Sequence, residues 1–324
     1  MKLFLYRGFL FTVPIVLFIL LYIYLDPFKV IKEYDVYLSD YVMIHRGYIS
    51  TKMYLKNKDK YHFDSFIFGS SRSCAHTSQD WENYLPSDCK AYSYGSWNEE
   101  ILGIYKKLYL IDSLGADIKN AFFVFDNSTF LARKNFLLKD HYLISGKSKL
   151  SFHLYYFKFY LDIRMIAASI DYKIFHTRRG YMKNFQGMKR GDLDPINNDW
   201  LRDKLPEDTL NHYKNFDHKS YKRSKIQQFA DHNIGDDDEH ILKMIYSILN
   251  KQNTNYKIVI APLYDQIKIN PEDLNILISI FGKVNVFDYS GINDITENCY
   301  NYFSDGLHYD SKIGERIFME IYAN

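Results

Sequence analysis

Cysteine is scarce in this sequence, and neither sign of charge dominates it. The 324 residues include 3 cysteines, too few for a disulfide framework, and at least one thiol is left unpaired within the chain. The formal net charge of +2 gives no reason to expect a nucleic-acid partner. The histidines lack the spacing of metal ligands, so we expect neither a metal site nor a cofactor. Hydrophobic residues, in contrast, make up 47% of the chain, which is enough to bury a large core.

The longest apolar run lies near the amino terminus. Residues 8–25, GFLFTVPIVLFILLYIYL, carry no charge, and the run is close to the roughly 20 residues that a membrane-spanning helix needs. No small-residue cleavage site follows, so the sequence predicts an uncleaved anchor within residues 1–28 rather than a signal peptide. Lys2 and Arg7 precede the run. The positive-inside rule therefore predicts a single-pass protein of the cytoplasmic membrane, held in the lipid bilayer by this helix, with its remaining domain extracytoplasmic.

Short apolar runs and amphipathic segments alternate through much of the remaining chain. Apolar residues recur at helical spacing in residues 98–115 and 236–252, and again after Ser311. This alternation predicts a three-layer α/β/α sandwich around a mostly parallel five-stranded sheet. We expect the main domain at 63–324, after a connector at 29–62. The runs with strand character are residues 63–69, 90–95, 120–126, 256–262 and 284–290.

Residues 131–234 interrupt this alternation, and we interpret them as an insertion in the main domain. Within them, residues 151–175 predict one long aromatic helix, and a basic loop follows at 177–198. The part from Leu131 to Arg190 is strongly basic. Three interpretations stay open for it: a solvated surface, a face resting on anionic lipid headgroups, and a face that binds an anionic glycan.

Polar residues follow three of the predicted strands, where ligands of an open parallel sheet bind. GSSR ends the first strand at 69–72, YGSWN ends the second at 94–98, and FDNS ends the third at 125–128. Asp305 and His308 stand three residues apart ahead of the last helix. A serine nucleophile needs a base to remove its proton, and the base needs an acceptor at its other nitrogen. Ser71, His308 and Asp305 are our candidates for these roles.

From about Phe63 to the end, this pattern resembles the SGNH, or GDSL-like, hydrolase superfamily, whose fold is flavodoxin-like. The resemblance implies that Ser71 is the nucleophile and that Asp305 and His308 complete the triad. It also implies oxyanion-hole donors at Gly95 and Asn127. The usual Gly-Asp-Ser is here Gly-Ser-Ser, which looks like membrane-anchored members that modify cell-envelope polymers. Gly-x-Asn-Asp is replaced by FDNS, so either Asp126 or Asn127 faces the site, and an ionised Asp126 would repel the oxyanion.

The resemblance implies acyl-ester chemistry on O-acyl groups, which we expect to be O-acetyl groups of an envelope or capsular polysaccharide. An acyl group on Ser71 would pass to a sugar hydroxyl in a transferase or to water in an esterase. An integral-membrane protein is the expected acyl donor. The alternative is a non-catalytic partner that keeps the fold to bind glycan or to assist assembly. Candidate substrate-binding residues are Arg72, Trp97 and Asn98, although Arg72 equally suits a local carboxylate and Trp97 suits the core.

Overall fold

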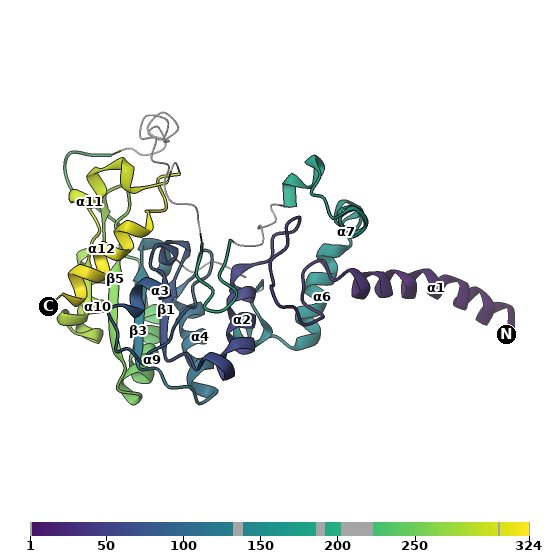
Figure 1. Cartoon of the computed structure of the whole chain (residues 1–324), viewed down its shortest axis with the longest axis horizontal. Coiled ribbons are helices and arrows are strands. Elements are labelled where there is room, and N and C mark those ends of the chain that lie inside the picture. The colour runs from purple at the N-terminus through teal and green to yellow at the C-terminus, as the bar shows by residue number, and fades with distance from the viewer. Residues whose placement is uncertain (1, 132–138, 186–191, 202–222, 304, 324) are drawn as a thin grey trace. The chain divides into compact units, whose positions relative to one another are not determined.

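The computed structural model describes residues 2–131, 139–185, 192–201, 223–303 and 305–323 (Figure 1). Its contacts divide the chain into two compact units. One unit consists of residues 1–45 and 141–192, and the other consists of residues 46–140 and 193–324. The predicted insertion is thus divided between the two units. The domain limits drawn from the sequence stay predictions.

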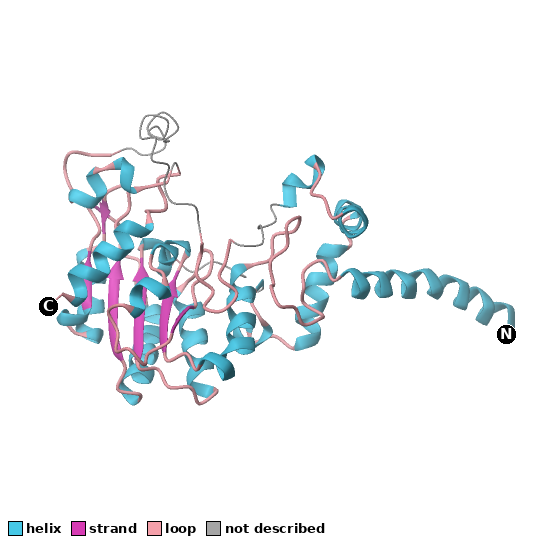
Figure 2. Cartoon of the chain, in the orientation of Figure 1, coloured by secondary structure: helices cyan, strands magenta, loops and turns pink. Residues whose placement is uncertain are grey.

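The second unit contains a five-stranded sheet in the order β2-β1-β3-β5-β7, and every pair of neighbours is parallel (Figure 2). This confirms the predicted α/β class and the five strands, and the sheet is parallel throughout. β1 and β3 are buried along their whole length, which explains why their sequences are continuously apolar. The strands are β1 (Ser65–Gly69), β2 (Ala91–Ser93), β3 (Asn120–Phe125), β5 (Asn255–Ile260) and β7 (Val286–Asp288).

The direction of each crossover assigns the helices to the two faces of this sheet. The chain moves one way from β1 to β2 and the opposite way through β3, β5 and β7, so right-handed connections put the two sets of helices on opposite faces. The helix contacts agree, because α3 packs on α12 while α9 packs on both α4 and α10. The helices concerned are α3 (Ser78–Glu82), α4 (Ile101–Ser113), α9 (Asp236–Lys251), α10 (Pro271–Phe281) and α12 (Ser311–Tyr322).

Alternate side chains of the strands fill the two layers of the core. Ile67 and Phe122 belong to the cluster that also contains Trp81 of α3 and Phe318 of α12. Phe66 points to the other layer, where its ring lies 5.8 Å from that of Tyr54 in α2 (Arg46–Tyr61). The order of the strands reverses between β1 and β3, and open α/β sheets bind their ligands at such a reversal.

The predicted long aromatic helix is wrong, because the chain forms two helices there. α6 (Lys149–Tyr160) and α7 (Ile163–Phe175) are separated at Asp162, whose carboxylate accepts a hydrogen bond from the Arg164 N–H at 2.9 Å. A carboxylate in this position caps a new helix, and the apolar pattern on either side conceals the break.

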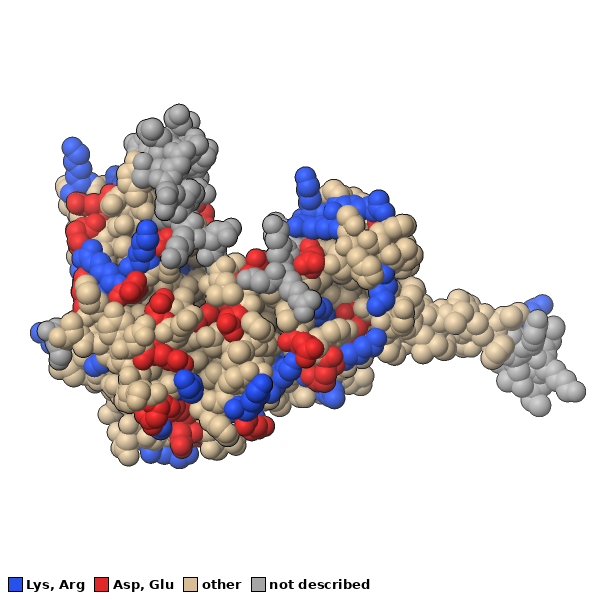
Figure 3. Space-filling view, viewed as in Figure 1, with Lys and Arg blue, Asp and Glu red and all other residues tan. Residues whose placement is uncertain are grey.

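Basic side chains gather at the end of α7 and in the 3₁₀ helix η4 (Gly180–Phe185), as the space-filling view shows (Figure 3). Arg178, Arg179 and Lys183 are exposed there. Arg179 pairs with Asp171 at 2.8 Å, so part of this charge is compensated locally. The three interpretations of the basic segment remain open.

The first unit begins with α1 (Lys2–Leu25). Within the described ranges, no helix is both long enough and apolar enough to cross a membrane. The anchor predicted for residues 1–28 is therefore without support.

The remaining elements of the described residues are short. They are α5 (Tyr142–Ser145), α11 (Asp294–Glu297), β4 (Gln228–Phe229), β6 (Ile267–Lys268) and the 3₁₀ helices η1 (Ser71–Ala75), η2 (Asn127–Phe130), η5 (Lys283–Asn285) and η6 (Cys299–Asn301).

Gly314 lets α12 lie directly against η1. A Cβ atom on Gly314 would stand 2.0 Å from the carbonyl oxygen of Ala75, which is far inside van der Waals contact. Because that oxygen belongs to the backbone, no side-chain rotation relieves the overlap. The glycine therefore determines how closely the last helix approaches the turn after β1.

We predict that Gly314→Ala lowers the free energy of unfolding by about 1–3 kcal/mol, because α12 must move away from η1. Denaturant unfolding of the purified chain measures this. Gly235→Ser is the control, since no atom lies within 4 Å of a Cβ at this helix-capping position of the same unit. We expect it to stay within about 0.5 kcal/mol of the wild type. Equal stability of the Gly314 variant and the control would contradict the close contact.

Candidate active site

The chain leaves the sheet abruptly at the end of β1. Gly69 has a φ of 154°, and a Cβ there would lie 2.7 Å from the carbonyl oxygen of Val124 in β3. Only glycine fits this turn. Ser70 then caps η1 by accepting a hydrogen bond from the Arg72 N–H. Ser71 follows as the first residue of η1, half-buried at the carboxyl edge of the sheet.

The structure brings Ser71, His308 and Asp305 together. His308 Nε2 lies 2.8 Å from Ser71 Oγ, and His308 Nδ1 lies 2.8 Å from Asp305 Oδ2. The carboxylate accepts a hydrogen bond from Nδ1–H, so a neutral imidazole in this tautomer presents Nε2 as an acceptor to the serine hydroxyl. This is the relation that the sequence predicted for these three side chains.

Asp305 is held as an anion by the turn around it. Burial by itself would raise its pKa, but the hydrogen bond and charge of His308 outweigh burial and hold the pKa at about 2. Oδ1 accepts two further hydrogen bonds, from the N–H groups of Leu307 at 2.9 Å and His308 at 3.1 Å. These bonds fix the carboxylate plane beside the imidazole.

Gly95 and Asn127 adjoin the turn at residues 69–71 from the two neighbouring strands. A Cβ on Gly95 would lie 2.5 Å from Ser73 Oγ, so the chain after β2 passes close to η1 only because this residue is glycine. Asn127 is half-buried and begins η2. Among the described residues, none accepts a hydrogen bond from the backbone N–H of Ser71 or Gly95 or from the Asn127 amide. Of these three residues, Ser71 lines the adjoining cavity, whereas Gly95 and Asn127 are not among its lining residues.

The Asp126 carboxylate faces Ser70 and Arg72, on either side of Ser71. It is buried, and Oδ2 accepts hydrogen bonds from Arg72 Nη1 at 2.8 Å and Ser70 Oγ at 3.2 Å. Oδ1 accepts a bond from the Ser128 N–H at 2.7 Å. Arg72 thus pairs with a local carboxylate, as one of its two predicted roles requires, and it also lines the cavity beside Ser71.

A cavity of about 210 Å³ opens beside Ser71 and His308. Trp200 forms part of its wall, and polar side chains of Thr77 and Asp80 also line it. The predicted substrate-binding residues Trp97 and Asn98 do not line this cavity. Trp97 packs against Trp200, with ring centroids 6.5 Å apart, and Asn98 is exposed.

Sequence reasoning missed Trp200 and the buried Arg46 behind it. The Arg46 guanidinium lies 5.3 Å from the Trp200 ring, and Nη1 lies 3.2 Å from Cys74 Sγ, another residue of the cavity wall. Neither residue belongs to a recognisable motif. A lone tryptophan in a segment without periodicity carries no signal of its place in the fold.

No model of a known protein family matches the chain, and no curated protein matches it. The relation to SGNH hydrolases therefore stays a prediction from the sequence motifs.

We predict a pH-dependent stability contribution from Asp305. Its pKa in the folded chain is about 2, below the ordinary 3.8, so the unfolded chain binds this proton more tightly. The contribution is full above about pH 4 and disappears as the pH falls toward 2. The stability difference between the wild type and Asp305→Asn should shrink over that window, as measured by denaturant unfolding at several pH values.

The matched control is Asp231→Asn, an exposed aspartate whose side chain makes no ion pair within the described ranges. Its stability difference should change little between pH 4 and 2. A constant difference for Asp305→Asn across that window would contradict the prediction.

Proposed function

We propose that this chain is a serine acyltransferase or esterase with Ser71 as its nucleophile. The observation that carries the proposal is the hydrogen-bonded series Ser71, His308 and Asp305 at the mouth of a cavity. A hydroxyl, an imidazole and a carboxylate in this order are the parts of a nucleophilic triad. Their position at the carboxyl edge of a parallel sheet adds support, since that edge is where such folds bind ligands.

In the proposed reaction, His308 Nε2 takes the proton of Ser71 Oγ while the oxygen attacks an acyl carbonyl. Asp305 stabilises the imidazolium that forms. The tetrahedral intermediate collapses when His308 gives the proton to the departing alcohol, and the acyl group stays on Ser71. A sugar hydroxyl or water, deprotonated by His308, then attacks the acyl-serine and regenerates the enzyme.

The oxyanion of that intermediate would accept hydrogen bonds from the N–H groups of Ser71 and Gly95 and from the Asn127 amide. Removal of one such donor costs about 10²- to 10³-fold in rate in enzymes of this kind. The ion pair between Arg72 and Asp126 supports the proposal, because it lets a carboxylate stand behind the nucleophile turn without an uncompensated charge.

The substrate part of the proposal comes from the SGNH resemblance and from the cavity. Its small volume suits a short acyl group such as acetyl, and the exposed part of Trp200 suits a sugar ring. O-acetyl groups of an envelope or capsular polysaccharide are the substrates that we propose. An extracytoplasmic location and an integral-membrane acyl donor remain predictions from the sequence.

A non-catalytic glycan-binding or assembly protein is the second candidate. The observation that favours it is Asp126, since the third block of the site carries a buried carboxylate beside Asn127. Such a protein would keep the fold and the cavity while its serine stays unreactive. The reactivity of Ser71 distinguishes the two candidates.

We predict that a fluorophosphonate probe labels the wild-type chain and that Ser71→Ala abolishes labelling. The reason is that only an activated hydroxyl attacks the phosphorus centre. Mass spectrometry of the labelled chain locates the adduct. Ser311→Ala is the control, because Ser311 lines the same cavity and should leave labelling unchanged. Absence of labelling in a folded wild-type chain would support the binding protein, and labelling of Ser71→Ala would exclude Ser71 as the nucleophile.

We predict that Trp200→Ala raises KM for a partially O-acetylated xylo-oligosaccharide by about 3- to 10-fold, because one aromatic contact with the sugar is lost. Hydrolysis of p-nitrophenyl acetate, which lacks a sugar, should change little. Trp200→Phe keeps an aromatic face and should stay close to the wild type. Equal losses on both substrates would instead assign Trp200 a structural role. Initial rates on the two substrates provide the comparison.

A further inference from the structure

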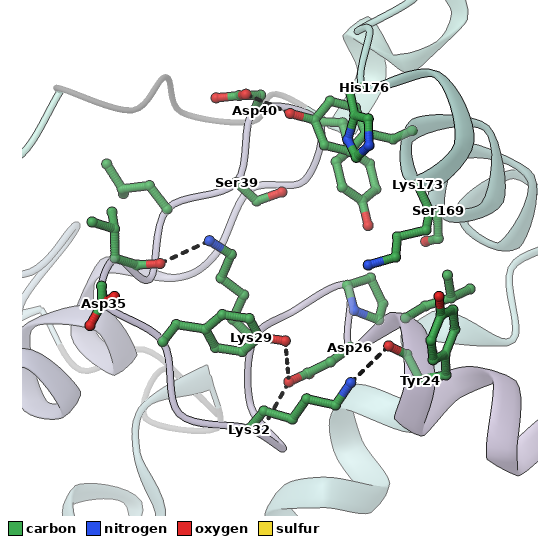
Figure 4. A pocket seen from close by; sticks show the side chains of 17 residues that line it. Tyr24, Asp26, Lys29, Lys32, Asp35, Ser39, Asp40, Ser169, Lys173 and His176 are labelled. Atoms are coloured by element: carbon green, nitrogen blue, oxygen red, sulfur yellow. Dashed lines mark hydrogen bonds between the residues drawn. The ribbon is translucent and has the colours of Figure 1, made fainter.

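A second cavity, of about 550 Å³, lies within the unit formed by residues 1–45 and 141–192 (Figure 4). It is enclosed by the end of α1, the chain that follows it and α7. Three lysines line it, Lys29, Lys32 and Lys173, together with four tyrosines and three aspartates. The proposed acyl-transfer chemistry uses none of these residues.

The turn after α1 is strained and tightly held. Asp26 and Lys29 have positive φ angles of 39° and 52°, which residues other than glycine rarely adopt. The buried Asp26 carboxylate holds the turn by accepting hydrogen bonds from the N–H groups of Val30 at 2.9 Å and Lys32 at 2.9 Å. It also accepts a bond from the Tyr34 hydroxyl at 3.0 Å. Backbone strain that is held in this way is typical of binding sites.

Two ammonium groups converge on the Tyr24 ring at the wall of this cavity. Lys32 Nζ lies 5.6 Å from the ring centroid and donates to the Tyr24 carbonyl at 2.9 Å, and Lys173 Nζ lies 5.3 Å from the same centroid. Figure 4 shows the Lys173 side chain extending into the cavity. Neither lysine forms an ion pair with a described residue.

Two of the three carboxylates of the wall accept hydrogen bonds from uncharged donors. Asp26 is satisfied by backbone N–H groups and by a tyrosine, and Asp40 accepts a hydrogen bond from the Tyr172 hydroxyl at 2.6 Å. Asp35 also lines the cavity, and it is exposed. The two lysines thus place two positive charges beside one ring, and an anion near both would be attracted to them.

We propose that this cavity binds an anionic group of the phosphate type, with Lys173 and Lys32 as its principal charged contacts. An ammonium group acts as a point charge that suits the tetrahedral phosphate group. Within the described ranges, no arginine lines the cavity, so its principal charged contacts are ammonium groups. A soluble phosphate ester and a phospholipid headgroup both carry this chemistry. The proposal goes beyond the proposed acyl transfer and does not depend on it.

The test uses the 324-residue chain with two kinds of probe. Calorimetry measures binding of inorganic phosphate and glycerol 3-phosphate, and vesicle flotation compares phosphatidylglycerol vesicles with phosphatidylcholine vesicles. Lys173→Met should weaken binding of the effective probe about fivefold to tenfold, while Lys173→Arg should restore most of it. Lys158→Met is the matched control, since Lys158 is an exposed lysine of the same unit that does not line the cavity.

Each outcome decides the proposal. If Lys173→Met weakens binding of the soluble probes alone, the ligand is a phosphate ester. If it weakens binding to the anionic vesicles alone, the ligand is a lipid headgroup. Equal effects of Lys173→Met and Lys158→Met would reduce the interaction to general surface charge and overturn the proposal. The proposal is also overturned if no probe binds the wild type. Circular dichroism confirms that each variant is folded before it is compared.

Discussion

The contact between α12 and η1 is the constraint on which the candidate site depends. Ser71 and His308 are 237 positions apart in the chain, and His308 lies just ahead of α12. Gly314 allows this helix to reach the Ala75 carbonyl, and the Tyr309 hydroxyl lies 3.0 Å from His76 Nε2 beneath the same turn. Burial lowers the pKa of His76 to about 3, so this imidazole stays neutral and is a packing residue of the core. The position of His308 thus follows from helix packing as much as from its own hydrogen bonds.

Two carboxylates of the site have opposite environments, and this difference gives them different roles. Asp305 is partly exposed and holds the imidazole, so its negative charge is available to an imidazolium. Asp126 is buried and pairs with Arg72, so its negative charge is compensated within the protein. Removal of Arg72 would leave a buried charge without compensation beside Ser71. The carboxylate at position 126 is therefore matched by the arginine that follows Ser71.

Much of the fold was predictable from the sequence because strands and helices leave periodic patterns. All five strands appear where the apolar runs placed them, and α4, α9 and α12 occupy the predicted amphipathic segments. Ser71, His308 and Asp305 were predictable because each follows a strand or precedes a helix in a fixed order. Features without periodicity were not predictable. The break at Asp162 depends on one capping side chain inside an apolar run, and the position of Trp200 depends on contacts between distant segments.

The segment that carries Trp200 shows how an irregular stretch acquires a defined position. The Ser93 N–H of the edge strand β2 donates to the Asn197 carbonyl at 2.9 Å, and Asn198 Nδ2 returns a bond to the Ser93 carbonyl at 2.7 Å. Asp199 then accepts from the Ser78 N–H at 2.8 Å, at the start of α3. An edge strand needs a partner for its unpaired backbone groups, and here the partner is a loop rather than another strand. Because the loop is bonded to both the edge strand and the start of a helix, the position of Trp200 in the cavity wall depends on contacts with both.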